Sequence, residues 1–172
     1  MGIYCEKCRY LSHTTEEHDG LQPVNFPRVG AATFVIKGTE ILLGRSKKLN
    51  NQIVIPSGGI KPFETVNDAA RREVLEKTGI ACLVQDILFV SEYIQPPQGA
   101  SWSGLADHRI VIYMLGQYVD GEPFAGDDLS EVFWADTREL AKYQNDMTDM
   151  TVDAIYKFSI ALRSRSMTQR AN

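Results

Sequence analysis

The chain of 172 residues lacks a long apolar run, and its longest stretch of this kind extends only from Ile110 to Leu115. A helix needs about 20 apolar residues to cross a bilayer. The first ten residues, MGIYCEKCRY, carry charges where a secretory signal has its apolar segment, so no signal peptide is expected. These absences favour a cytoplasmic protein with no membrane partner.

Cysteine and excess basic charge are also scarce. The three cysteines are an odd number, which is a poor basis for a disulfide framework and favours a reducing compartment. Lysine and arginine number 18 against 22 aspartates and glutamates, giving a net charge of -4. Such a surface has no general attraction for nucleic-acid phosphates, so RNA is not an expected partner. A polyanionic substrate must therefore bind at a local basic site or at a metal ion.

The hydrophobic content of 44% is that of an ordinary globular protein. The polar first stretch predicts an N-terminal extension (1–27), followed by one domain (28–166) and a C-terminal tail (167–172). Within the domain, strands are expected at 29–36, 40–44, 52–55, 83–93, 109–119 and 132–134, and an amphipathic final helix at 150–164. Lys37-Gly38-Thr39 predicts a hairpin turn between the first two strands. This mixture indicates one α/β domain with helices covering a sheet.

A further helix is expected to begin after Thr65 and to end at Gly79. Thr65 is a good N-cap, and Asp68 three residues later completes a start similar to a capping box. Glycine is the usual residue just past the end of a helix. The expected apolar side consists of Val66, Ala69, Ala70, Val74 and Leu75.

This helix displays two carboxylates. Glu73 and Glu76 are three residues apart, so they lie on one face of the helix, one turn from each other. Neighbouring carboxylates repel each other unless a cation lies between them. Together with a carbonyl from a glycine turn, they suit a hard octahedral ion such as Mg²⁺ or Mn²⁺. Such an ion keeps positions open for phosphate and for the water that attacks phosphorus.

The segment from Gly58 to Ile80 resembles the signature of the Nudix family, G-x5-E-x7-R-E-U-x-E-E-x-G-U, where U is aliphatic. The chain matches eight of nine fixed positions across twenty-three residues, which is far more specific than a lone glycine motif. Leu42-Leu43-Gly44-Arg45 also resembles an upstream strand of the family. The matching positions are Gly58, Glu64, Arg72, Glu73, Val74, Glu76, Gly79 and Ile80.

The resemblance implies an α/β/α sandwich around a mixed β-sheet and a homodimer, which is common in the family. It implies that Glu73 and Glu76 bind the metal with the Ser57 carbonyl as a third ligand. Arg72 would orient the carboxylates, and Glu64 would support the loop or bind a second metal. The chain departs from the signature at Lys77, where the family has its last glutamate. Either fewer metals bind and the ammonium contacts a substrate phosphate, or the domain binds without cleaving.

Acidic residues downstream resemble a family loop that holds the catalytic base. Asp127 and Asp128 are the candidates, which the sequence does not separate, and Glu131 lies close by. For each of them, a solvated acid in a turn is an equally good interpretation. Arg45, Lys77 and Arg109 are candidates for binding substrate phosphate, although such cations are more often simply solvated.

The N-terminal extension has a second set of candidate ligands. Cys5, Cys8, His13 and His18 combine thiolate and imidazole groups at the short spacings that suit tetrahedral Zn²⁺. The alternative is a tail in which these side chains bind nothing. A zinc knuckle that presents capped RNA ends to the catalytic segment is a further alternative.

Three functions fit these features. The favoured one is a pyrophosphohydrolase that uses metal-activated water on a nucleoside diphosphate derivative such as ADP-ribose or a nucleotide sugar, because the segment from Ala125 to Leu140 resembles such family members. The strand around Arg45 and the segment Asp107-His108-Arg109 resemble nucleoside triphosphate pyrophosphohydrolases equally well. Lys77 supports a third function, a non-catalytic nucleotide sensor that regulates a partner.

Overall fold

A computed structural model of the chain describes residues 27–95 and 107–170. The expected zinc ligands Cys5, Cys8, His13 and His18 lie outside these residues, so zinc binding stays a prediction. Contacts divide the chain into two compact units. Among the described residues, the larger unit comprises 29–91 and 111–170, and the smaller comprises 27–28, 92–95 and 107–110. The predicted boundaries at 27 and 166 stay predictions.

A seven-stranded sheet contains all the strands of the described residues. Its principal order is β3-β2-β1-β6-β5, with β4 paired to β1 and β7 paired to β2. The strands are β1 (Arg28–Lys37), β2 (Glu40–Ser46), β3 (Gln52–Val54), β4 (Ser57–Gly59), β5 (Ala81–Gln95), β6 (Asp107–Asp120) and β7 (Leu129–Asp136). Each strand expected from the sequence is present, and β4 is an addition.

The predicted hairpin between β1 and β2 is confirmed. The two strands are antiparallel, with Lys37 opposite Glu40 and Ile36 opposite Ile41, so Gly38 and Thr39 form the turn. Gly38 has a φ of 62°, a left-handed conformation that glycine adopts without steric cost. The hairpin places β1 at the centre of the sheet, where β4 joins it with Ala31 opposite Gly58.

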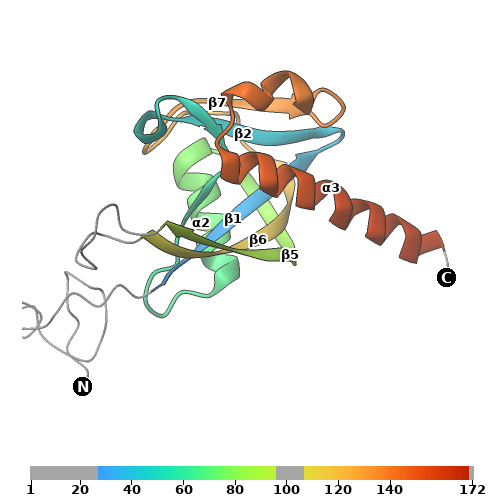
Figure 1. Cartoon of the computed structure of the whole chain (residues 1–172), viewed down its shortest axis with the longest axis horizontal. Helices are drawn as coiled ribbons and strands as arrows, with labels where there is room; N and C mark the ends of the chain where they lie inside the picture. The colour runs from blue at the N-terminus through green and yellow to red at the C-terminus, as the bar shows by residue number, and fades with distance from the viewer. Residues whose placement is uncertain (1–26, 96–106, 171–172) are drawn as a thin grey trace, which may run out of the picture. The chain divides into compact units, whose positions relative to one another are not determined.

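Helices cover both faces of this sheet (Figure 1). Helix α2 (Val66–Thr78) packs on one face, where Val74 joins Val35 of β1 in a buried cluster. Helix α3 (Asp149–Arg170) packs on the other face, where the ring of Phe158 stacks on Phe34 at 4.2 Å between centroids. Adjacent strand residues point to opposite faces, which explains how Phe34 and Val35 contact different helices. The predicted α/β/α architecture around a mixed sheet is confirmed.

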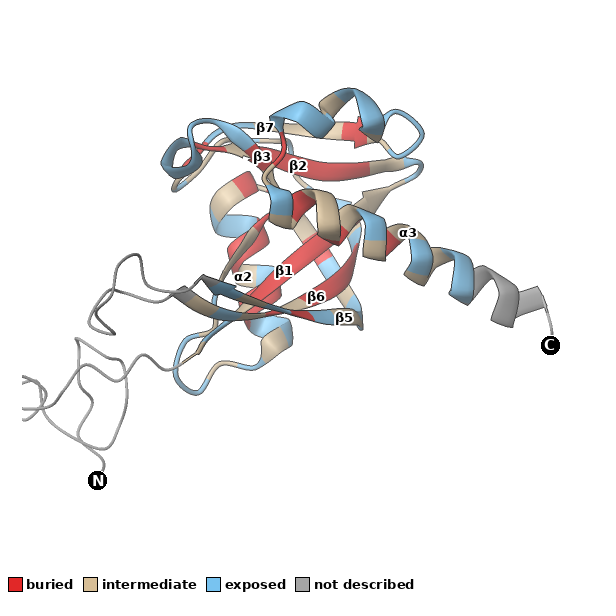
Figure 2. Cartoon of the chain, in the orientation of Figure 1, coloured by how far each residue is buried: buried red, intermediate tan, exposed pale blue. Residues whose placement is uncertain are grey.

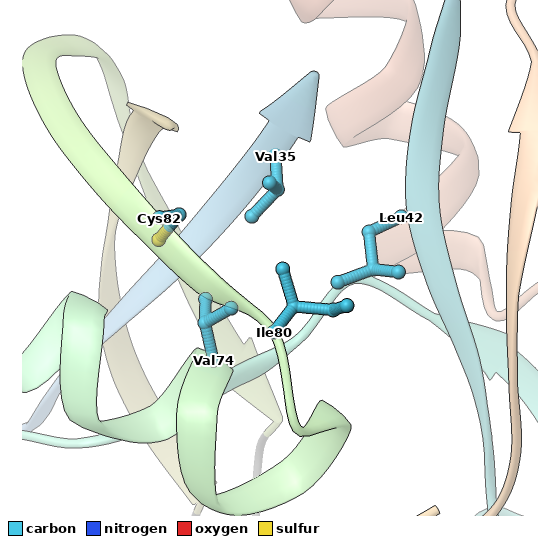
Figure 3. Close-up of a cluster of buried hydrophobic side chains, with 5 residues drawn as sticks. All are labelled: Val35, Leu42, Val74, Ile80 and Cys82. Atoms are coloured by element: carbon cyan, nitrogen blue, oxygen red, sulfur yellow. The ribbon is translucent and has the colours of Figure 1, made fainter. Parts of the chain in front are cut away.

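Short 3-10 helices η1 (Lys47–Leu49) and η2 (Leu140–Asp146) lie in the connections. Buried residues concentrate on β1, β2 and the sheet-facing side of α2 (Figure 2). Figure 3 shows one cluster, in which the side chains of Val35, Leu42, Val74, Ile80 and Cys82 point toward one another. This core holds α2 in one rotation against the sheet.

The orientation of α2 against the sheet differs from the expected one at Leu75. Leu75 was expected on the apolar side, but the residue is 55% exposed. The buried side contains Ala69, Ala70 and Val74 and extends instead to Glu73, which is only 8% exposed. No helix among the described residues is long and apolar enough to span a membrane.

Candidate functional site

The candidate site is built on α2, whose two ends are capped as expected. The Thr65 hydroxyl accepts a hydrogen bond from the Asp68 backbone N–H at 3.1 Å and donates one to the Asp68 carboxylate at 2.7 Å. At the other end, Gly79 has a φ of 69° and its N–H donates to the Leu75 carbonyl. These caps satisfy backbone groups that a helix end leaves unpaired. The register of the acidic residues on α2 is therefore well defined.

Arg72 connects the carboxylates of the site. Its guanidinium binds both oxygens of Glu64, with Nε 2.6 Å from Oε1 and Nη2 2.9 Å from Oε2. The Nη1 atom donates to Glu73 at 2.6 Å and to Glu76 at 3.1 Å, and Nη2 also donates to the Gly59 carbonyl at 3.0 Å. The planar guanidinium suits such bidentate pairing. One side chain therefore joins the loop before α2 to two carboxylates on the helix.

This network keeps Glu64 and Arg72 ionised. The hydrogen bond from Arg72 and a second one from the Lys61 backbone N–H lower the pKa of Glu64 to about 2. The same bond to Glu64, with those to Glu73 and Glu76, raises the pKa of Arg72. Glu64 therefore carries a full negative charge at neutral pH and holds Arg72 in position.

The lowered pKa of Glu64 predicts a pH dependence of stability. Because the folded pKa is about 2 and the ordinary value is 4.5, ionised Glu64 stabilises the fold above pH 4.5, and this contribution is lost as the pH falls toward 2. Glu64→Gln should therefore lower the midpoint of denaturant unfolding at pH 7 more than at pH 3. Glu139→Gln, which removes one charge at an exposed turn, is the control. Equal losses at both pH values would contradict the prediction.

Strand β4 passes directly beside the Glu73 carboxylate. A Cβ atom added at Gly58 would lie 1.9 Å from Cδ of Glu73 and 2.0 and 2.2 Å from its two oxygens. Nothing lies within 4 Å of a Cβ added at the next residue, Gly59. Only glycine fits at position 58 while Glu73 keeps this position. Gly58 of the signature thus leaves room for the carboxylate of Glu73, which also belongs to the signature.

Lys77, the departure from the signature, is surrounded by carboxylates. Its Nζ atom lies 2.8 Å from Asp128, 3.6 Å from Asp127 and 4.0 Å from Glu73. Burial alone would raise the pKa of Asp128, but hydrogen bonds and charge from Lys77 and Lys48 lower it overall. The structure thus brings both candidate bases to α2, and Asp128 is ion-paired with two lysines.

The loop that carries these aspartates is attached to the C-terminal end of α2. The Phe124 N–H donates to the Thr78 carbonyl and the Gly126 N–H to the Lys77 carbonyl, both at 2.9 Å. A Cβ atom added at Gly126 would lie 2.3 Å from the Glu76 carbonyl oxygen, so the loop approaches the helix as closely as glycine allows. No periodicity in the sequence predicted this attachment.

Two further residues, Arg45 and Arg109, were candidates for binding substrate phosphate. The guanidinium of Arg45 pairs with Glu131 at 3.1 Å and with Asp146 at 2.8 Å. These contacts give Arg45 a role in joining β2 to β7 and η2, and its contact with substrate phosphate stays a prediction. Arg109 belongs to the smaller unit, so its predicted contact with substrate stays a prediction.

A recess of about 370 Å³ lies beside Glu76. Its lining includes Arg72 and Glu76 of the network, together with Arg71, Leu75 and Cys82. Burial raises the pKa of the Cys82 thiol to about 11, so this cysteine is not a nucleophile at neutral pH. The recess therefore offers a ligand both charged groups and apolar surface next to Glu76.

Within residues 27–95 and 107–170, no group of three or more His, Cys, Asp or Glu side chains is arranged to hold a metal ion. Arg72 and Lys77 instead lie between the carboxylates. Ser57 is in β4, where it pairs with Ala32 of β1, and the role of its carbonyl as a ligand stays a prediction.

The model of the NUDIX domain family matches residues 26–153 of this chain. Among curated proteins, an ADP-ribose pyrophosphatase of Methanocaldococcus jannaschii is 32% identical over 121 residues, covering 67% of this chain and 66% of that protein. A human protein, nucleoside diphosphate-linked moiety X motif 6, is 29% identical over 118 residues, covering 68% of this chain and 36% of that protein. This chain thus spans just under two thirds of the first relative and about a third of the second.

Solved structures show the same fold. A NUDIX hydrolase from Nitrosomonas europaea superposes with a TM-score of 0.64 at 20% identity, covering 78% of this chain and 90% of that chain. A bifunctional NMN adenylyltransferase/ADP ribose pyrophosphatase from Francisella tularensis, complexed with AMP and manganese, has a TM-score of 0.62 at 19% identity. That match covers 88% of this chain and 45% of that chain.

Proposed function

Because this chain belongs to the Nudix family, we propose that it is a pyrophosphohydrolase that cleaves the phosphoanhydride bond of a nucleoside diphosphate derivative in the cytoplasm. One observation carries the proposal. The Glu73 carboxylate lies against Gly58 and shares the Nη1 atom of Arg72 with Glu76. Two carboxylates of the signature therefore converge beside a glycine loop, as a site for a phosphate-bound cation requires.

The chemistry of the donor groups suits a divalent metal, which would displace Arg72 from between the carboxylates. Glu73 and Glu76 supply carboxylate oxygens, and the Glu76 side chain is 51% exposed, which leaves it accessible to an ion. With the Ser57 carbonyl and Glu64 as further oxygen donors, the set suits Mg²⁺ or Mn²⁺. Such an ion would neutralise charge on the substrate phosphates and activate water. The Francisella tularensis structure with manganese and AMP supports this choice of ion and ligand class.

Arg72 and Glu64 hold the two carboxylates in position. Arg72 is a positioning residue, because it holds Glu73 and Glu76 from one guanidinium while Glu64 binds that guanidinium at two points. This arrangement keeps two like charges close together before any ion binds. Preorganised charge of this kind is the usual way in which phosphoryl-transfer enzymes stabilise the transition state.

Asp127 is the better candidate for the general base. Asp128 is paired with Lys77 and Lys48, and its lowered pKa weakens it as a proton acceptor. The Asp127 side chain is 58% exposed and lies 3.6 Å from Lys77, so water and substrate can reach it. We therefore assign Asp127 to take the proton from water and Asp128 to hold the loop.

An ADP-ribose or nucleotide-sugar substrate is favoured. The Methanocaldococcus jannaschii relative is named an ADP-ribose pyrophosphatase, which supports this class. The recess next to Glu76 offers apolar surface at Leu75 and a cation at Arg71, which suits a part of the substrate beyond the diphosphate. A nucleoside triphosphate is the alternative substrate.

A substrate panel tests the proposal. Purified chain with Mg²⁺ or Mn²⁺ is incubated with ADP-ribose, nucleotide sugars, dinucleotides and nucleoside triphosphates, and the products are identified by mass spectrometry. The expected result is a nucleoside monophosphate plus a sugar phosphate. Release of pyrophosphate from triphosphates alone would favour the alternative substrate, and no product from any compound would refute the proposal.

A nucleotide sensor is the second candidate function, since Lys77 places a cation where the signature has an acid. A sensor would show stabilisation by nucleotide in a thermal melt without turnover, both in the wild type and in Lys77→Glu. The hydrolase is expected to turn over substrate, and restoring the acid at position 77 should increase its rate.

A further inference from the structure

The ammonium of Lys77 occupies a fixed position inside the site. Its side chain is only 12% exposed, whereas that of Lys48, which also pairs with Asp128, is 73% exposed. An ammonium with so little access to water is costly unless carboxylates surround it. Asp128, Asp127 and Glu73 supply three of them, at 2.8, 3.6 and 4.0 Å.

The backbone on both sides of this ammonium is also fixed. Lys77 follows Glu73 by one helical turn, and the Lys77 carbonyl accepts the hydrogen bond from Gly126 that attaches the loop of the two aspartates. The ammonium therefore joins an acid on α2 to two acids on the loop. A point charge among several carboxylates has the same electrostatic role as a bound cation.

We infer that Lys77 is a built-in cation that takes the place of a divalent ion between Glu73 and the Asp127–Asp128 loop. Metal would then bind only at Glu73 and Glu76, where it displaces the Nη1 atom of Arg72 that donates to both carboxylates at 2.6 and 3.1 Å. The inference rests on the proposed function for the identity of the Glu73–Glu76 metal position. It also explains how the loop stays attached to α2 before any metal is bound.

Counting bound metal tests this inference without a substrate. Mn²⁺ is titrated into the full chain, and free Mn²⁺ is measured by electron paramagnetic resonance. The wild type should bind about one ion, and Lys77→Glu should bind about one more, because four carboxylates then surround the vacated position. Lys142→Glu makes the same change in net charge at an exposed 3-10 helix and should bind as the wild type does.

A second measurement covers the case in which Lys77→Glu does not fold. Lys77→Gln removes the ammonium but adds no acid, so three carboxylates each lose one cationic partner, while Asp128 keeps Lys48 and Glu73 keeps Arg72. Its melting temperature should be lower than that of the wild type, and Mn²⁺ should raise it more than it raises that of the wild type. Equal shifts, or equal ion counts in the wild type and a folded Lys77→Glu, would overturn the inference.

The outcomes separate this inference from the proposed function. If the substrate panel gives no product but Lys77→Glu gains an ion, the hydrolase proposal fails and the role of Lys77 stands. If hydrolysis occurs and the ion count does not change on substitution, the role of Lys77 fails and the hydrolase proposal stands.

Discussion

Glu73→Gln is expected to lower kcat/KM by at least about 100-fold. A metal ion contributes several kcal/mol to the stabilisation of the transition state, and about 1.4 kcal/mol corresponds to a tenfold change in rate. Glutamine has nearly the same shape as glutamate and can still accept the hydrogen bond from Arg72 that Glu73 accepts at 2.6 Å. The loss should therefore come from the missing negative charge, and steady-state kinetics on the substrate found in the panel would measure it.

The control for this change is Asp153→Asn on α3, which removes one exposed carboxylate paired with Lys157. Its kcat/KM should stay close to that of the wild type. Circular dichroism and thermal melts of Glu73→Gln should show a folded protein, and its affinity for Mn²⁺ should fall. A folded Glu73→Gln with nearly full activity would contradict the assignment of Glu73 as a ligand.

Gly58→Ala should have an effect of similar size without removing any charge. The new methyl group would lie 1.9 to 2.2 Å from the atoms of the Glu73 carboxyl group, so the carboxylate must move away. A displacement of about 1 Å in a catalytic arrangement can reduce the rate by about 100-fold. We expect kcat to fall by about this factor, as measured by steady-state kinetics, while the protein remains folded.

Gly59→Ala is a closely matched control, because it makes the same chemical change one residue later. Nothing lies within 4 Å of the added Cβ, so its activity should be close to that of the wild type. The double variant Gly58→Ala/Glu73→Gln should lose little more than either single variant, because both act on the same carboxylate. Equal activity of the Gly58 and Gly59 variants would show that the contact is not important.

Local sequence patterns predicted α2 and its acidic face well. The capping residues Thr65 and Asp68, the stop at Gly79 and the hairpin at Gly38 all lie where the sequence placed them. These features depend on hydrogen bonds and backbone conformations within a few residues, which sequence spacing determines directly. Membership of the Nudix family was predicted from the same segment and is confirmed.

Burial and pairing across the sheet were predicted less well. Leu75 was expected to face the core because it is apolar, yet it is exposed while Glu73 is buried. No pattern in the sequence indicated the partner of Arg45, which strand register places opposite Glu131 and which pairs with that side chain. Both results depend on which surface lies opposite each side chain. The residues of one helix or strand do not specify which element packs against it.

The sequence by itself determined that Glu73 and Glu76 share a helix face, because a regular helix brings residues three apart together. Only the tertiary structure decided what surrounds Lys77. Its carboxylate partners on the loop are 50 and 51 residues away and reach it because the N–H groups of Phe124 and Gly126 bind carbonyls at the end of α2. Contacts between residues so far apart in the sequence depend on how the chain packs. The surroundings of the Lys77 ammonium are therefore a property of the fold.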